Sequence, residues 1–448
     1  MDRERALDYA RAAVAFALEA GASQAQARVV SSRRCAVQAR DRTLTSLERS
    51  SGATLRLRIF CDGRTATLST TPMSRDDLRS LVAAAVESAG HVERDPHAGL
   101  PDPSDLASPD DRPDLALVDA AMRDRSDGER IEEALEMERT AREADPRIVN
   151  SEGSRYDDAF SIIALADSHG FTGAYEGTRA HRSCSPVALD GSLKRLSHYG
   201  TAGRRLSEME SAESVARTAA RRAVEMCGAR RPPSGRFPVV FERDVAASLL
   251  SELFAAVNAA NVARGDSWLI GKLGERVGSS SFTVIDDGRI AGAPGSAPFD
   301  AEGVATRRTV VLDRGVLQTY LYDTYYARKL GARSTGNASG DGVAPTTFLV
   351  SPGEGSLETI VRATRRGLLV FDLIGFSTEH ASGLYSRGAS GFWIEDGEVA
   401  YPVDGCTIAG MLPEMFANVD AVAADLRIDG SIVSPSLRIA EMIVSGDE

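Results

Sequence analysis

Apolar residues near the start of the chain recur at helical spacing and then alternate as in a strand. In residues 3–20 they stand three and four positions apart, with Asp2 in front of them as a candidate N-cap. In residues 54–60 apolar side chains alternate with Arg56 and Arg58, which predicts a strand with one buried face. Shorter strand candidates precede it at residues 27–30, 35–38 and 43–47. The pattern therefore predicts a helix followed by an antiparallel meander.

The meander is expected to end in a hairpin and a second helix. Asp62-Gly63 is a typical two-residue hairpin turn, and it leads into a strand candidate over residues 65–69. Ser74 and Asp77 then resemble a capping box in front of an apolar helix over residues 78–88. We therefore expect residues 1–90 to form an N-terminal α+β domain with the order helix, meander, helix.

The next part of the chain passes from linker-like to structured sequence. Residues 91–125 are rich in proline and aspartate, which predicts an extended linker. A polar helix over residues 128–143, several strands and a long helix over residues 207–229 follow. The Arg-Pro-Pro-Ser-Gly segment at 231–235 is the best domain boundary. We interpret residues 126–235 as a middle α+β region that completes the N-terminal half.

Residues 236–448 have stronger β character and form the expected C-terminal domain. They begin with a buried strand at residues 239–241 and an apolar helix over residues 244–262. A strongly apolar strand candidate covers residues 367–374, and Glu395-Asp396-Gly397 predicts a hairpin. The fold class expected for the chain is α+β: an N-terminal helix–antiparallel meander–helix domain followed by a C-terminal mixed, β-rich domain.

Composition and charge exclude several classes of protein. The longest apolar runs in the 448 residues are far shorter than the roughly 20 residues of a membrane span. The five cysteines are odd in number and widely spaced, so we expect reduced thiols in a cytoplasmic protein. The net charge of −12 makes nucleic acid an unlikely partner. Only three of the 52 basic residues are lysines, which indicates a GC-rich bacterial genome and not a function.

No segment carries a self-evident catalytic motif. Residues 331–338 have the glycine spacing of a phosphate-binding loop, but they lack its lysine and its magnesium-binding hydroxyl. The serine-hydrolase pattern Gly-x-Ser-x-Gly is absent. His181 and Cys184 are the only close pair of potential zinc ligands, and on a strand they would point to opposite faces. His380 is of interest because a glycine-rich segment follows it.

Three longer segments carry a resemblance to a known family. They are residues 267–287, 310–338 and 383–412, and the linker phrase Ala98-Gly99-Leu100-Pro101-Asp102 also fits. Over nearly its whole length the chain resembles the TldD/PmbA family, and in particular its PmbA branch, also called TldE. The resemblance implies a heterodimer of two related subunits, in which the TldD-type subunit is a zinc metallopeptidase with an HExxxH helix.

The resemblance places that motif on the helix expected over residues 244–262. Ser251 and Ala256 stand where the two histidines would be, and only Glu252 matches the motif. A serine hydroxyl and an alanine methyl group cannot replace the imidazole ligands of Zn²⁺. We therefore expect no metal and no cofactor in this chain, and we expect the zinc in a TldD-like HExxxH partner subunit.

The first hypothesis that follows is a non-catalytic TldE/PmbA-like subunit. It would pair with the HExxxH subunit and shape a chamber for a peptide held as an extended strand, in proteolysis or in the maturation of small peptides. The residues expected to line the substrate or the subunit interface are Ser334, Thr335, Gly336, Asn337, Ser386, Arg387 and Gly388.

Two alternatives stay open. The chain would instead be a stand-alone hydrolase or tailoring enzyme acting on a peptide-like conjugate in natural-product biosynthesis, and its candidate residues are then His380, Ser386, Arg387 and Cys406. The family's older name, modulator of DNA gyrase, suggests a regulatory protein, although the acidic net charge disfavours contact with DNA.

Overall fold

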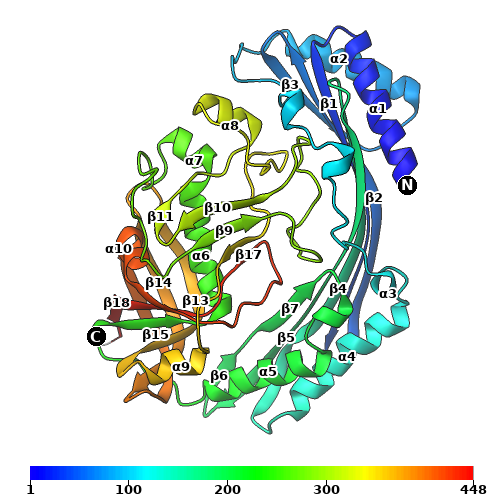
Figure 1. Cartoon of the computed structure of the whole chain (residues 1–448). Coiled ribbons are helices and arrows are strands. Elements are labelled where there is room, and N and C mark those ends of the chain that lie inside the picture. The colour runs from blue at the N-terminus through cyan, green and yellow to red at the C-terminus, as the bar shows by residue number, and fades with distance from the viewer. Residues whose placement is uncertain (447–448) are drawn as a thin grey trace.

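The N-terminal half of the protein is built on one long, curved sheet (Figure 1). The structure is a computed structural model that describes residues 1–446, except for the side chain of residue 376. The sheet has seven antiparallel strands in the order β3-β2-β1-β4-β5-β6, and β7 pairs with β5. Its strands are β1 (Gln24–Arg40), β2 (Thr43–Cys61), β3 (Arg64–Thr70), β4 (Ile148–Asp167), β5 (Thr172–Asp190), β6 (Leu193–Leu196) and β7 (Tyr199–Gly203).

The short strands predicted at the start of the chain are parts of two long ones. β1 and β2 each run without interruption, and the turn between them places Asp41 and Arg42 at positive φ. The predicted strands are too short because polar residues such as Arg33 and Arg34 interrupt the apolar alternation, whereas the extended chain continues through them. β1 pairs with β4 from Gln26 to Ala39, so one sheet joins residues from the first and the middle region.

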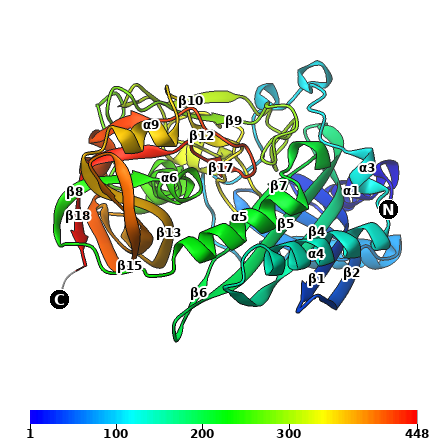
Figure 2. The same cartoon turned by 90° about the horizontal axis from the view of Figure 1, so that it is seen from below.

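Helices cover the outer, convex face of this sheet, and the C-terminal half fills its concave side (Figures 1 and 2). One apolar cluster, which includes Ala13 and Leu57, holds two helices over one end of the sheet, and a second, which includes Val37 and Ala219, holds the others over the opposite end. The helices are α1 (Arg3–Glu19), α2 (Arg75–Ala89), α3 (Ala120–Arg123), α4 (Asp127–Glu143) and α5 (Ala212–Glu225). α5 is shorter than predicted because the Ser211 side chain caps it, accepting from Ser214 N.

The Pro- and Asp-rich segment between the two regions is a packed strap and not a free spacer. It contains two short 3₁₀ turns, η1 (Pro103–Asp105) and η2 (Pro109–Asp111), and its Leu100 and Leu117 side chains are buried. Ala107 N donates to Gly303 O at 2.9 Å, which ties the strap to the C-terminal half. The predicted irregular backbone is present, but apolar side chains fix it in place.

The C-terminal half contains two further sheets. One has five strands in the order β11-β10-β9-β12-β17. The other has the order β15-β14-β13-β8-β18-β16, and it closes on itself because β15 also pairs with β18. The strands are β8 (Gly235–Phe241), β9 (Val284–Asp287), β10 (Arg308–Asp313), β11 (Val316–Leu317), β12 (Phe348–Val350), β13 (Arg366–Glu379), β14 (Leu384–Glu395), β15 (Glu398–Met411), β16 (Val419–Val422), β17 (Ile432–Val433) and β18 (Leu437–Ser445).

An apolar helix, α6 (Arg243–Val257), runs through the core of this half (Figure 1). The predicted helix over residues 244–262 ends early at Asn258, whose side chain accepts from Ala260 N and caps the next helix. The remaining helices are α7 (Ala259–Arg264), α8 (Thr324–Lys329), α9 (Leu357–Arg362) and α10 (Leu412–Ala417). Within the described residues, no helix is both long and apolar enough to span a membrane. The predicted α+β class, with a helix and meander before a mixed, β-rich half, is confirmed.

Candidate functional site

The glutamate at the motif position of α6 forms a buried ion pair. Glu252 is only 7% exposed, and Arg387 on β14 donates to its Oε1 at 2.5 Å. The other carboxylate oxygen lies 3.7 Å from Nδ1 of His380, in the turn after β13. Arg387 also donates to Gly375 O on β13. Helix α6 and the β13–β14 hairpin thus bring together a carboxylate, a guanidinium and an imidazole.

The strand geometry explains why Arg387 reaches α6. Side chains alternate along β14, so Tyr385, Arg387 and Ala389 share its buried face. The guanidinium carbon lies 5.6 Å from the centre of the Tyr385 ring. Because Arg387 is 7% exposed, the aromatic ring and the carboxylate provide the contacts that offset the loss of its hydration.

The two positions that correspond to the motif histidines do not suit a metal. Ser251 Oγ donates to Ala247 O at 3.0 Å, and Ala256 is a fully buried methyl group. Glu252 is already engaged by Arg387. Among the described residues, no group of three or more His, Cys, Asp and Glu side chains is placed to hold a metal ion. The zinc implied by the resemblance therefore does not fit the residues of this chain.

Two other residues proposed for a stand-alone enzyme lie away from this cluster. Ser386 alternates with Arg387 along β14, so its side chain points to the opposite face of the sheet. Cys406 on β15 donates to Ala389 O at 3.2 Å, and burial raises the pKa of its thiol to about 11. A thiol of that kind is a poor nucleophile near neutral pH. Of the four candidates, the structure brings only His380 and Arg387 to Glu252.

Gly388, which we expected to line the substrate or the subunit interface, packs against the neighbouring strand β13. A Cβ added at Gly388 would lie 3.3 Å from the Cβ of Ile374 on β13. Ile374 itself is 59% exposed, so this part of the hairpin presents apolar surface to the outside.

The loop Ser334–Asn337 is fixed around a buried carboxylate. Asn337 Nδ2 and Thr346 Oγ1 each donate to Asp286 Oδ2 at 2.7 Å. Burial raises the pKa of Asp286 to about 6. Asp286 lies on strand β9 with 1% exposure. The carboxylate organises the loop, and nothing in its spacing in the sequence indicated this.

The same loop is held on its other side by backbone contacts. Ser334 Oγ donates to Tyr322 O at 3.4 Å, and Thr335 Oγ1 accepts from Tyr322 N at 2.8 Å. Gly336 adopts φ 79°, and a Cβ there would lie 2.6 Å from Ala305 O. Gly336 and Asn337 line a cavity of about 230 Å³, together with Tyr175 of the N-terminal sheet. Part of the predicted loop therefore faces a space between the two halves.

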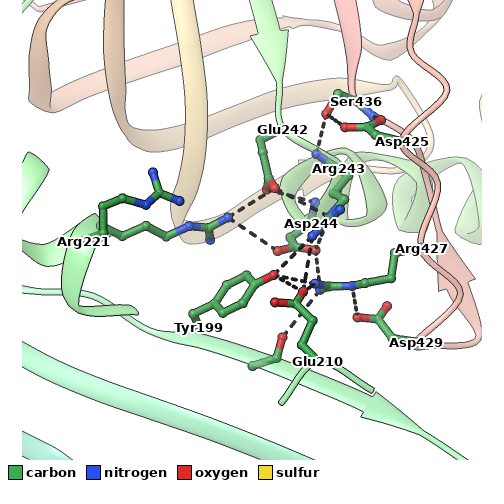
Figure 3. Close-up of polar contacts among 12 residues, drawn as sticks. Tyr199, Glu210, Arg221, Glu242, Arg243, Asp244, Asp425, Arg427, Asp429 and Ser436 are labelled. Atoms are coloured by element: carbon green, nitrogen blue, oxygen red, sulfur yellow. Dashed lines mark hydrogen bonds and ion pairs between the residues drawn. The ribbon is translucent and has the colours of Figure 1, made fainter. Parts of the chain in front are cut away.

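A polar network that sequence reasoning missed joins the halves beside the start of α6 (Figure 3). The Tyr199 hydroxyl on β7 lies 2.6 Å from Glu210 Oε1 and 2.6 Å from an Arg427 nitrogen. Arg427 also donates to Asp244 in the first turn of α6 at 2.9 Å. These residues come from segments without a common motif, so only the folded chain shows their relation.

The network continues to the N-cap of α6. Arg222 on α5 lies 3.2 Å from Glu242 Oε1, and the other oxygen of Glu242 accepts from Asp244 N. Burial, with the neighbouring Asp244, raises the pKa of Glu242. A cavity of about 620 Å³ opens beside it, lined by His198 and Asp372 among others. The N-terminal end of helix α6 is thus anchored to the N-terminal half, whereas Glu252 lies nearer to the C-terminal end of the helix.

Comparison with known families identifies the architecture. Three family models match consecutive parts of the chain: PmbA/TldA metallopeptidase domain 1 over residues 25–89, the central domain over residues 121–226 and the C-terminal domain over residues 234–446. The chain belongs to the PmbA/TldD family. The resemblance drawn from the sequence is confirmed at this level.

Curated relatives of the PmbA/TldD family match most of the chain. It is 33% identical to the metalloprotease PmbA homolog of Haemophilus influenzae, over 98% of this chain and 96% of the relative. It is also 33% identical to metalloprotease PmbA of Escherichia coli O157:H7, over 90% and 87%. The metalloprotease TldD homolog of Haemophilus influenzae is 29% identical, over 52% of each chain.

Solved structures of family members share the fold. A Bacteroides thetaiotaomicron protein, described as a candidate modulator of DNA gyrase, is 27% identical and superposes with a TM-score of 0.93 over 100% of both chains. TldE from Thermococcus kodakarensis is 22% identical and superposes with a TM-score of 0.88, over 98% of this chain and 100% of that one. The second match indicates the fold alone.

Proposed function

We propose that this chain is a cytoplasmic, non-catalytic TldE/PmbA-like subunit of a heterodimeric zinc metallopeptidase. The observation that carries the proposal is the state of α6. It offers Ser251 and Ala256 where an HExxxH helix would offer histidines, and Arg387 occupies the remaining carboxylate, Glu252. The zinc and the water that attacks the peptide bond would then belong to a TldD-like HExxxH partner.

The ion pair of Glu252 supports a structural role for this residue. A metallopeptidase glutamate must take a proton from the metal-bound water, which requires a carboxylate oxygen directed at that water. In this chain Oε1 of Glu252 accepts from Arg387, and Oε2 faces His380 at 3.7 Å. The carboxylate therefore fixes the β13–β14 hairpin against α6.

The hairpin also offers a surface on which a peptide would bind. β8 pairs with β13 only at Leu368–Val370, so from Phe371 onward that edge of β13 has no strand partner among residues 1–446. A free strand edge can add an extended peptide through backbone hydrogen bonds. The exposed Ile374 side chain lies on this segment. We propose that the pair of subunits encloses a peptide substrate there, in proteolysis or peptide maturation.

The test is to purify the chain alone and together with an HExxxH subunit of the same family. Zinc per chain is measured by plasma mass spectrometry, and hydrolysis of a mixed peptide library is followed by mass spectrometry. We expect zinc and hydrolysis only in the pair. Substitution of the partner's motif glutamate by glutamine serves as the control and should abolish hydrolysis. Stoichiometric zinc and hydrolysis by this chain alone would overturn the proposal.

One observation favours the second candidate, a stand-alone enzyme on a peptide-like conjugate. His380 is 32% exposed at its side chain, and its Nδ1 lies 3.7 Å from the buried Glu252 carboxylate, within ion-pair distance although too far for a hydrogen bond. Turnover of a peptide conjugate by metal-free protein, lost in His380→Ala, would support this candidate. The third candidate is a regulatory protein that modulates DNA gyrase, as the Bacteroides relative is described. The net charge of −12 disfavours this candidate because it disfavours contact with DNA.

A further inference from the structure

The middle of the outer face of the N-terminal sheet is left open by the helices. α1 and α2 cover one end of this face, and α4 and α5 cover the other (Figure 1). The strand register shows what lies between them. Arg33 on β1 stands opposite Ser51 and Phe160, and the next row places Cys35 opposite Arg49 and Asp158. Opposite residues share a face, so two arginines and an aromatic ring meet in this gap.

The gap forms a cavity of about 590 Å³ in which arginines outnumber carboxylates. Six arginines and two carboxylates line it, in a chain whose net charge is −12. Three serine hydroxyls and the apolar surfaces of Met122, Ala159 and Phe160 complete the wall. The charged residues are Arg33, Arg34, Arg49, Arg123, Arg125, Arg130, Asp127 and Asp158.

The inner arginines are held rigidly by acidic partners. Arg130 is 11% exposed and donates to both oxygens of Asp158, at 2.7 and 3.2 Å. Arg125 is 14% exposed and pairs with Glu133 of α4. Fixed guanidinium groups of this kind do not have to be ordered when an anion arrives, which lowers the entropic cost of binding.

The outer arginines differ in whether an acidic partner neutralises their charge. Arg33 lies over the Phe160 ring, with its guanidinium carbon 5.3 Å from the ring centre. Among residues 1–446, neither Arg33 nor Arg34 forms an ion pair, while Arg49 and Arg123 pair with Asp127 and Asp124. Both Arg33 and Arg123 are exposed. Arg123 donates from Nε and one terminal nitrogen to Asp124, which leaves its other terminal nitrogen for a ligand.

We propose that this cavity, the arginine cleft, binds a phosphate-bearing small molecule of nucleotide size. A volume of about 590 Å³ lies within the range of small-molecule sites. Several guanidinium forks around one space suit a group with many anionic oxygens better than a single carboxylate. Phe160 offers an aromatic surface to the organic part of such a ligand. The proposal stands independently of the peptidase role proposed above.

The test uses calorimetric titration of the full chain at low ionic strength with adenosine triphosphate, inorganic pyrophosphate and adenosine as probes. We expect adenosine triphosphate to bind more tightly than pyrophosphate, adenosine not to bind, and the affinity to fall as salt is added. Equal affinity for the two phosphates would overturn the assignment of a nucleotide-sized ligand. Absence of binding by both would overturn the cleft as an anion site.

Two double variants, each of which removes two arginines, distinguish binding in the arginine cleft from nonspecific electrostatic attraction. Arg33→Ala with Arg123→Ala should weaken binding of adenosine triphosphate about tenfold or more, because charge-assisted hydrogen bonds are lost. Arg217→Ala with Arg221→Ala removes exposed arginines from α5 and should leave the affinity unchanged. Equal losses in the two variants, or no loss in the first, would overturn the proposal. All four positions are exposed, and an unchanged urea midpoint confirms that each variant is folded.

Discussion

Arg387 and Glu252 form an ion pair across 135 positions of sequence, between strand β14 and helix α6. The pair connects the β13–β14 hairpin to α6, the helix to which the family resemblance assigns the HExxxH position. The helix therefore has a structural contact at Glu252.

Removing one partner of this pair should be costly. Glu252→Ala leaves the Arg387 guanidinium buried without its carboxylate, and we expect the free energy of unfolding to fall by about 3–5 kcal/mol. Urea denaturation followed by circular dichroism measures the change. Glu213→Ala, which removes an exposed partner of Arg217 on α5, is the control and should cost under about 1 kcal/mol. Equal costs would mean that the buried pair contributes no more than a surface pair.

The polar network that joins the two halves beside the start of α6 predicts losses of stability of different size for two substitutions. Tyr199→Phe removes a hydroxyl, but Arg427 still pairs directly with Glu210 at 2.7 Å, so we expect a loss of about 1–2 kcal/mol. Arg427→Met removes the cation paired with Asp429 and the nearest cation to Asp244, which keeps only Arg222 and Arg243 at 3.8 Å, and it should cost about 3 kcal/mol or more. Calorimetry should show a larger fall in the melting temperature for Arg427→Met than for Tyr199→Phe. A melting temperature that falls no further for Arg427→Met than for Tyr199→Phe would contradict this role.

Asp323 should make stability depend on pH. Its side chain caps α8 by accepting from Tyr326 N, and burial with the nearby Glu302 raises its pKa from 3.8 to about 6. Between these values the folded carboxyl keeps a proton that the unfolded one has lost, so stability falls as pH rises through this window. Asp323→Asn keeps the cap without titrating.

The Asp323→Asn variant should not lose this stability as the pH rises. The difference between its free energy of unfolding and that of the unsubstituted protein should therefore be about 3 kcal/mol more favourable to the variant at pH 8 than at pH 4, which is the free energy of roughly two pKa units. Urea denaturation of both proteins across this range measures the difference. A difference that stays constant from pH 4 to pH 8 would show that Asp323 does not titrate in this way.

Two glycines with similar backbone angles should respond differently to alanine. Gly331 has φ 69° with open space around it, while Gly336 has φ 79° and would place a Cβ 2.6 Å from Ala305 O. Gly331→Ala should lower the free energy of unfolding by about 1–2 kcal/mol, because alanine disfavours the left-handed conformation. Gly336→Ala should lower it by at least about 1 kcal/mol more, because the loop must also move to make room for the Cβ. Thermal unfolding of both variants gives the comparison. Equal costs would mean that the loop yields freely.

Local patterns predicted the elements but not the contacts among distant ones. Alternation identified the strand at residues 54–60, and helical spacing behind the Asp2 cap identified α1, because both signals lie within one element. The motif position of Glu252 came from the family resemblance. Its contact with Arg387 depends on how a hairpin packs on a helix, which no local spacing encodes. Arg427 went unnoticed for the same reason.

The closed sheet of the C-terminal half has a consequence for how the protein is made. β8 opens this half at Gly235, and its neighbour β18, at Leu437–Ser445, is synthesised after the other strands of this half. β18 also pairs with β15, so the ring closes only when β18 has been made. The N-terminal half contains all of its own strands by Gly203. It can therefore form during synthesis, whereas the C-terminal half, with helix α6 at its centre, must wait for its final strand.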